Sequence, residues 1–125
     1  MKRVEGIFRP ERLGDVSNAL EEAGFGGFTI SDVRGHGHSP EKVGEWRGQT
    51  YEVRVSHKLA IDLIVEDDEV AGAISAIIAG ARTGKVGDGL VTVSDIGAVY
   101  QIRAGMPGVM SPNGNHGAPT ETGGV

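Results

Sequence analysis

The order in which strand-like and helix-like apolar spacing alternates along the chain restricts its fold more than any other feature. Alternating apolar residues are typical of strands, whereas apolar residues at steps of three and four are typical of helices. The patterns follow one another as strand, helix, strand, strand, helix, strand, over residues 2–9, 10–23, 28–33, 51–65, 67–81 and 90–96. This order predicts a split βαβ arrangement in an α+β domain.

A sheet of this kind packs both helices on one face and leaves the other face uncovered, which predicts self-association. We therefore expect a ferredoxin-like βαββαβ sandwich that covers this face with further copies of itself. The domain is predicted to span residues 1–104. Residues 105–125 are mostly Gly, Pro, Ser, Asn and Thr with almost no apolar side chain to bury, which predicts a disordered tail.

The sequence also predicts where individual elements begin and end. Pro10 is expected to open the first helix, because proline is tolerated in a first helical turn. Asp67 and Asp68 are expected to supply the N-cap and first-turn carboxylates of the second helix. Residues 99–102 contain three apolar side chains and are expected to form a last short strand.

Between the second and third strands, residues 35–50 read G-H-G-H-S-P-E-K-V-G-E-W-R-G-Q-T and show neither apolar pattern. Long aperiodic loops are uncommon in small domains and are usually functional. The sequence therefore predicts a long polar loop that projects from the sheet.

Composition excludes several classes of protein. The net charge is −5, the charges are interspersed, and no basic patch is present for nucleic acid or an anionic membrane. The chain has no cysteine, which excludes disulfides and thiolate sites, and no apolar run approaches membrane-spanning length. We expect a cytoplasmic protein that does not bind nucleic acid.

The segment T-G-K-V-G-D-G, Thr83–Gly89, joins the second helix to the last strand. A glycine-rich turn can direct backbone N–H groups at phosphate oxygens, but it can equally be a tight connection that needs positive φ. The residues alone leave both interpretations open.

Metal binding and catalysis have little support in the sequence. His36 and His38 could share a metal ion from one side of an extended segment, yet no third ligand lies at convincing spacing. No nucleophile–base pair or paired carboxylates occur at telling spacing either. We predict no metal site and no enzymatic activity.

Three segments resemble the PII signal-transduction proteins. Thr83–Gly89 is similar to that family's T-G-x-x-G-D-G, and G-H-G begins the long loop at Gly35. W-R-G-Q-T-Y, which ends at Tyr51, is similar to the family's Y-R-G-A-E-Y. The resemblance covers about residues 1–104.

The resemblance implies a homotrimer with adenine nucleotide, not a prosthetic group, in clefts between subunits. The long loop, here about residues 36–50, would be the T-loop that contacts a partner, a membrane transporter or a metabolic enzyme. Trp46, Arg47 and Tyr51 are the predicted contact residues, and Tyr51 matches a position that some members modify. The implied nucleotide-binding residues are Thr29, Gly35, Gly37, Lys58, Asp62, Gly87, Asp88, Gly89 and Arg103.

Four departures from the family pattern change the expected ligand. His38 and Ser39 stand where members have Arg and the magnesium-binding Gln, and Leu90 and Gln101 replace two further cations. We therefore expect ADP or AMP to bind at least as well as ATP, and 2-oxoglutarate not to bind. Two alternatives stay open: a trimeric adaptor that senses no ligand, and a PII-like sensor linked to bicarbonate and carbon metabolism.

Overall fold

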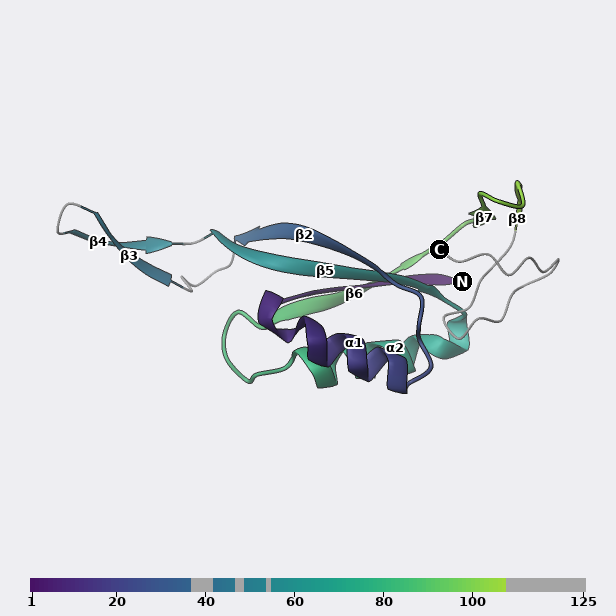
Figure 1. Cartoon of the computed structure of the whole chain (residues 1–125), viewed down its shortest axis with the longest axis horizontal. Helices are drawn as coiled ribbons and strands as arrows, with labels where there is room; N and C mark the ends of the chain where they lie inside the picture. The colour runs from purple at the N-terminus through teal and green to yellow at the C-terminus, as the bar shows by residue number, and fades with distance from the viewer. Residues whose placement is uncertain (37–41, 47–48, 54, 108–125) are drawn as a thin grey trace.

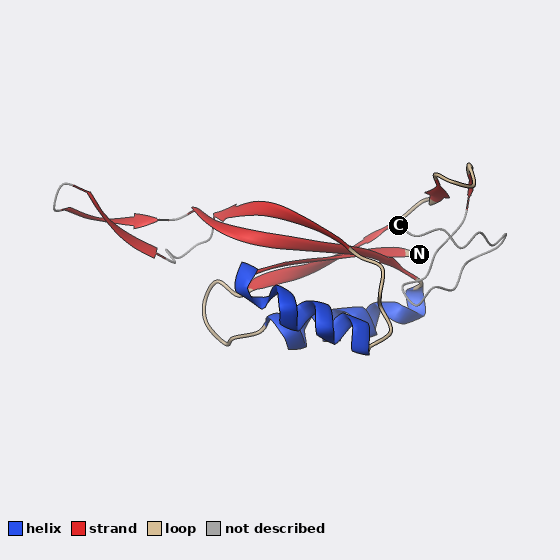
Figure 2. Ribbon diagram, viewed as in Figure 1, coloured by secondary structure: helices blue, strands red, loops and turns tan. Residues whose placement is uncertain are grey.

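A four-stranded antiparallel sheet with two helices on one face forms the body of the protein (Figures 1 and 2). The computed structural model describes residues 1–36, 42–46, 49–53 and 55–107. The strands lie in the order β2-β5-β1-β6. They are β1 (Lys2–Phe8), β2 (Thr29–His36), β5 (Val55–Val65) and β6 (Gly89–Asp95). The ferredoxin-like α+β prediction is confirmed.

The helices are α1 (Leu13–Glu22) and α2 (Val70–Ala81), and each follows a short 3-10 turn, η1 (Pro10–Arg12) or η2 (Asp67–Glu69). Alternate residues from Val4 to Phe8 in β1 and from Leu59 to Val65 in β5 are buried against the helices, as the alternating pattern predicts. These strand residues form the core with Val16, Leu20, Phe25, Ala73, Ala76, Ile77 and Ala81. The two helices lie side by side against this face (Figure 1).

The start of the second helix differs from its prediction. Glu66, not Asp67, is the N-cap of the η2 turn, and its backbone N–H donates to the Glu69 carboxylate at 2.9 Å. Glu69 is the N-cap of α2, and Asp67 and Asp68 lie in the first turn of η2, as predicted. Asp67 instead accepts a hydrogen bond from the Met1 amino group at 2.6 Å, which lowers the pKa of its carboxyl. A contact across 66 residues of chain could not be inferred from local capping rules.

The segment predicted as an aperiodic loop contains a hairpin. β3 (Lys42–Trp46) pairs with β4 (Gln49–Val53) and extends away from the sheet beyond β2 and β5 (Figure 1). The prediction of a loop without regular structure is therefore wrong for these ranges, although the segment does project. Pairing within the hairpin needs no apolar face, so apolar spacing gives no signal for it.

The short strand expected over residues 99–102 is present as β7 (Tyr100–Gln101), but its pairing differs from a strand added to the sheet. It pairs with β8 (Met106–Pro107), not with the main sheet. Regular structure thus continues past the predicted boundary at residue 104. The rest of the predicted disordered tail, residues 108–125, lies outside the described residues.

The second strand is more exposed than predicted. β2 lies at one edge of the sheet, and six of its eight residues are exposed, including Ile30 at 41%. The alternating pattern over residues 28–33 is typical of a strand with one buried face. An edge position explains the difference, because neighbouring elements cover an edge strand on one side only.

Candidate functional site

The glycine-rich loop, residues 83–89, connects the end of α2 to β6 and reverses the direction of the chain. Gly84, Gly87 and Gly89 have φ angles of 87°, 96° and 105°, a region that residues with a side chain rarely adopt. At Gly89 an added Cβ would lie 1.8 Å from the carbonyl oxygen of Ile7. Glycine is therefore required here both by conformation and by close approach to β1.

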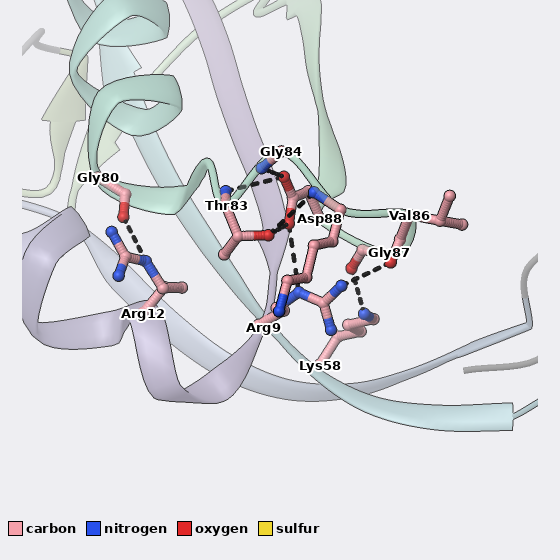
Figure 3. Close-up of polar contacts among 10 residues, drawn as sticks. Arg9, Arg12, Lys58, Gly80, Thr83, Gly84, Val86, Gly87 and Asp88 are labelled. Carbon is pink, nitrogen blue, oxygen red and sulfur yellow. Dashed lines mark hydrogen bonds and ion pairs between the residues drawn. The ribbon is translucent and has the colours of Figure 1, made fainter. Parts of the chain in front are cut away.

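The Asp88 carboxylate closes this loop from inside. It accepts hydrogen bonds from the backbone N–H groups of Thr83 at 2.9 Å and Gly84 at 2.8 Å, and from the Thr83 hydroxyl (Figure 3). These bonds, the hydroxyl first, hold the pKa of Asp88 well below its usual value, with a smaller contribution from Arg9. Asp88, predicted as a nucleotide-binding residue, thus contacts its own loop.

Two cations hold the loop from the adjoining strands. Arg9 follows β1 and donates from Nε to Asp88 at 3.2 Å and from Nη2 to the Val86 carbonyl at 2.6 Å. Lys58, on β5 and only 6% exposed, donates from Nζ to the Gly87 carbonyl at 2.5 Å (Figure 3). The loop is therefore closed by its own hydrogen bonds and is also contacted by two positively charged side chains.

The predicted nucleotide-binding residues form two groups in one chain. Gly35 lies beside Lys58, with 3.6 Å between its added Cβ and the lysine Cγ, and Lys58 contacts the loop at Gly87. Thr29 and Asp62 face each other four ladder positions further along the sheet. Asp62 pairs with Arg3 at 2.7 Å, away from the loop.

Arg103 lies in the turn between β7 and β8. These two strands come after the C-terminal end of β6, whereas the glycine-rich loop precedes its N-terminal end (Figure 1). β6 leaves the loop at Gly89 and ends at Asp95, opposite Lys2. One chain therefore does not bring Arg103 to the glycine-rich loop.

The predicted T-loop residues are described only in part. Trp46 ends β3 and pairs with Gln49, and Tyr51 lies in β4 opposite Gly44. Arg47 and Gly37 lie outside the described residues. Their predicted roles stay predictions.

Sequence reasoning missed Arg9 and Thr83 as parts of this site. Thr83 could have been found, because a threonine five residues before an aspartate in a glycine-rich turn can bond to it. The signal for Arg9 is weaker: it directly precedes Pro10, which holds Arg9 extended at φ −65° and ψ 135°. Only the pairing of Phe8 with Gly89 shows that this extended residue adjoins the loop.

Two other features lie apart from the loop contacts. His57 pairs with Asp32 at 2.9 Å, and the described residues contain no group of three or more side chains that could hold a metal ion. An apolar groove of about 290 Å³ runs between α2 and β6. Lys58 and Gly87 do not line this groove, but Asp88 and Gly89 do, so the groove adjoins the glycine-rich loop on the side of α2.

Comparison with known proteins identifies the family. The family model for nitrogen regulatory protein P-II matches residues 1–106. The chain belongs to the P-II family. A nitrogen regulatory protein P-II from Microchaete diplosiphon is 43% identical over 105 residues, which cover 84% of this chain and 94% of that protein. P-II 1 of Escherichia coli strain K12 is 39% identical with the same coverage. P-II 2 of Methanothermobacter thermautotrophicus is 38% identical over a region that covers 86% of this chain and 94% of that protein.

Membership of the P-II family confirms the resemblance that the glycine-rich motif indicated. The chain is therefore a P-II signalling protein. Among the described helices, none has the length and apolar character needed to cross a membrane.

Proposed function

We propose that this P-II protein binds an adenine nucleotide against the glycine-rich loop and, in response, controls a partner protein through the β3–β4 hairpin. The observation that supports the proposal is the shape of this loop. Its glycines adopt positive φ and Asp88 bonds inward, which together form a short turn. Lys58 and Arg9 bond to that turn from outside. Such turns bind phosphate through backbone N–H groups. The contacts that close the loop use the N–H groups of residues 83–85, so we assign phosphate to the N–H groups of residues 86–88.

Lys58 is assigned to the edge of the phosphate site. An ammonium group has three donors, so a bond to the Gly87 carbonyl is compatible with a bond to phosphate. Burial to 6% exposure limits the positions that its Nζ can reach, which favours a fixed contact over a solvated charge.

The site is proposed to lie between copies in a homotrimer. Arg103, Thr29 and Asp62 lie far along the sheet from the loop, so a second copy must supply them. A head-to-tail contact that repeats around an axis closes a ring in which each loop meets the next copy's β7–β8 segment. Ring closure explains how residues at opposite ends of one chain can share a ligand.

The proposed preference among adenine nucleotides rests on two uncharged residues at positions where the family pattern has cations. Leu90 follows the loop directly and is 57% exposed, so an uncharged side chain stands where the family pattern has a lysine. Gln101 in β7 is uncharged as well. We propose that ADP or AMP binds at least as well as ATP, and that Ser39 and Pro40 remove 2-oxoglutarate binding.

The partner is proposed to be a membrane transporter or a metabolic enzyme in the cytoplasm. It would contact Trp46, Arg47 and Tyr51. Of these, Trp46 lies in β3 and Tyr51 in β4, in the hairpin that projects beyond the sheet. The protein itself is proposed to be a regulator, not an enzyme.

Calorimetry with ATP, ADP and AMP, each with and without magnesium and 2-oxoglutarate, tests the proposal. We expect heat from ADP or AMP that 2-oxoglutarate does not change. Absence of heat from every nucleotide would instead indicate the ligand-independent adaptor. Tight magnesium-ATP binding that 2-oxoglutarate strengthens would contradict the proposed ligand choice.

A further inference from the structure

The junction between β1 and η1 holds the glycine-rich loop from outside. Pro10 keeps Arg9 extended, and pairing of Phe8 with Gly89 places this residue next to the loop. The Arg9 side chain is 20% exposed and bridges two points of the loop, the Asp88 carboxylate and the Val86 carbonyl (Figure 3).

These contacts set the direction of one backbone N–H group. In a planar trans peptide the carbonyl and the following N–H point in opposite directions. The Val86 carbonyl faces Arg9, so the N–H of Gly87 points away from Arg9. In the same way the bond from Lys58 to the Gly87 carbonyl turns the N–H of Asp88 away from the lysine.

We propose that Arg9 is a positioning residue for the phosphate site, because it holds the Gly87 N–H in the direction needed to donate to an anionic ligand. The role rests on the proposed nucleotide binding, and Arg9 acts through the loop without touching the ligand. A guanidinium suits this task, since two of its nitrogens can reach two acceptors in fixed geometry and an ammonium offers a single nitrogen.

Arg12 provides a matched control on the same segment. Its Nε donates to the Gly80 carbonyl at 2.9 Å, and its Nη1 pairs with Asp15 at 3.0 Å. It therefore joins the two helices, with a similar exposed fraction of 30%, and makes neither of the loop contacts of Arg9. Arg12→Gln should reduce stability without changing the loop.

The experiment compares Arg9→Gln, Arg9→Lys and Arg12→Gln in the full chain. Calorimetry with ADP should show affinity about tenfold lower for Arg9→Gln and partial recovery for Arg9→Lys, because lysine keeps the charge but not both bonds. In the ligand-free protein, amide exchange at residues 83–88 should be faster in Arg9→Gln, and the Asp88 carboxyl should titrate at higher pH. Arg12→Gln should match the wild type in all three measurements.

Arg9→Gln with wild-type exchange and wild-type Asp88 titration would overturn the inference. If Arg9→Gln does not fold, Arg9→Lys decides by the same measurements. If the wild-type chain binds no ADP, AMP or ATP, the proposed function fails, and the role of Arg9 in the loop is then decided by exchange and titration in the ligand-free protein.

Discussion

Asp88 illustrates how a residue in a binding motif can act on its own backbone. Its carboxylate bonds to Thr83 and Gly84 and to Arg9, so its charge stabilises the turn and does not face outward. A carboxylate directed at a phosphate would repel it. With Asp88 bonded within the loop, its carboxylate does not conflict with the proposed binding of an anion.

The pH dependence of the loop should follow this arrangement. The pKa of Asp88 is lowered in the folded state, so its contribution is fully present above its usual value of 3.8 and is lost only as pH falls through the lower folded value. We expect the carboxyl resonance of Asp88 to show almost no titration between pH 7 and pH 3.8, where an unperturbed aspartate would be half protonated. Thr83→Val removes the largest cause of the shift and should raise this pKa. Titration of wild-type Asp88 at or above its usual value would contradict the assignment.

Lys58→Ala tests the proposed contact with phosphate. A charge-assisted hydrogen bond to phosphate contributes roughly 1.5–3 kcal/mol, so calorimetry should show ADP binding weaker by that amount. Lys2→Ala is the control, because Lys2 pairs with Asp95 at the far end of β6. Equal ADP affinity in the wild type and Lys58→Ala would remove Lys58 from the site.

At the level of elements, the sequence predicted those parts that bury an apolar face. β1, β6 and both helices lie close to their predicted ranges, because burial imposes regular spacing. The strand predicted over residues 51–65 is wrong at its start, since β5 begins at Val55 and residues 51–53 belong to β4. The β3–β4 hairpin and the pairing of β7 with β8 were not predicted, since the two strands of each hairpin pair with one another and not with the main sheet. In the site, the motif predicted the loop and the family resemblance predicted Lys58. Arg9 adjoins the loop only through the pairing of β1 with β6, which no local sequence pattern indicates.

The contact between α1 and α2 depends on one glycine. An added Cβ at Gly80 would lie 2.6 Å from the Cα of Val16 and 2.7 Å from the Asp15 carbonyl oxygen. Gly80→Ala should therefore lower the free energy of unfolding by about 1–3 kcal/mol, despite the better helix propensity of alanine. Chemical denaturation measures this change.

Gly14 in α1 is the control for Gly80, because its added Cβ meets nothing within 4 Å. Gly14→Ala should raise stability by about 0.5–1 kcal/mol through helix propensity alone. If both variants gain stability, the close approach of the helices at Gly80 does not restrict side-chain size.

At the scale of the whole molecule, the chain carries complementary parts at opposite ends. The glycine-rich loop lies at one end of β6, and β7–β8 follows the other end with Ile102 fully exposed at 100% and Tyr100 at 63%. Exposed apolar side chains of this size favour association. A ring of copies would cover them and bring Arg103 to a neighbouring loop.

Mixing two inactive variants tests this arrangement directly. Lys58→Ala and Arg103→Ala should each bind ADP poorly as pure trimers, because every site then lacks one cation. Around any mixed ring, one interface joins an intact Lys58 from one copy to an intact Arg103 from the next. An equal mixture, refolded together, should therefore regain about a quarter of the wild-type sites, counted by calorimetry. Two differently tagged Lys58→Ala proteins form the control and should regain none. If mixed trimers form, as shown by native mass, and no site returns, Lys58 and Arg103 do not share a ligand across the interface.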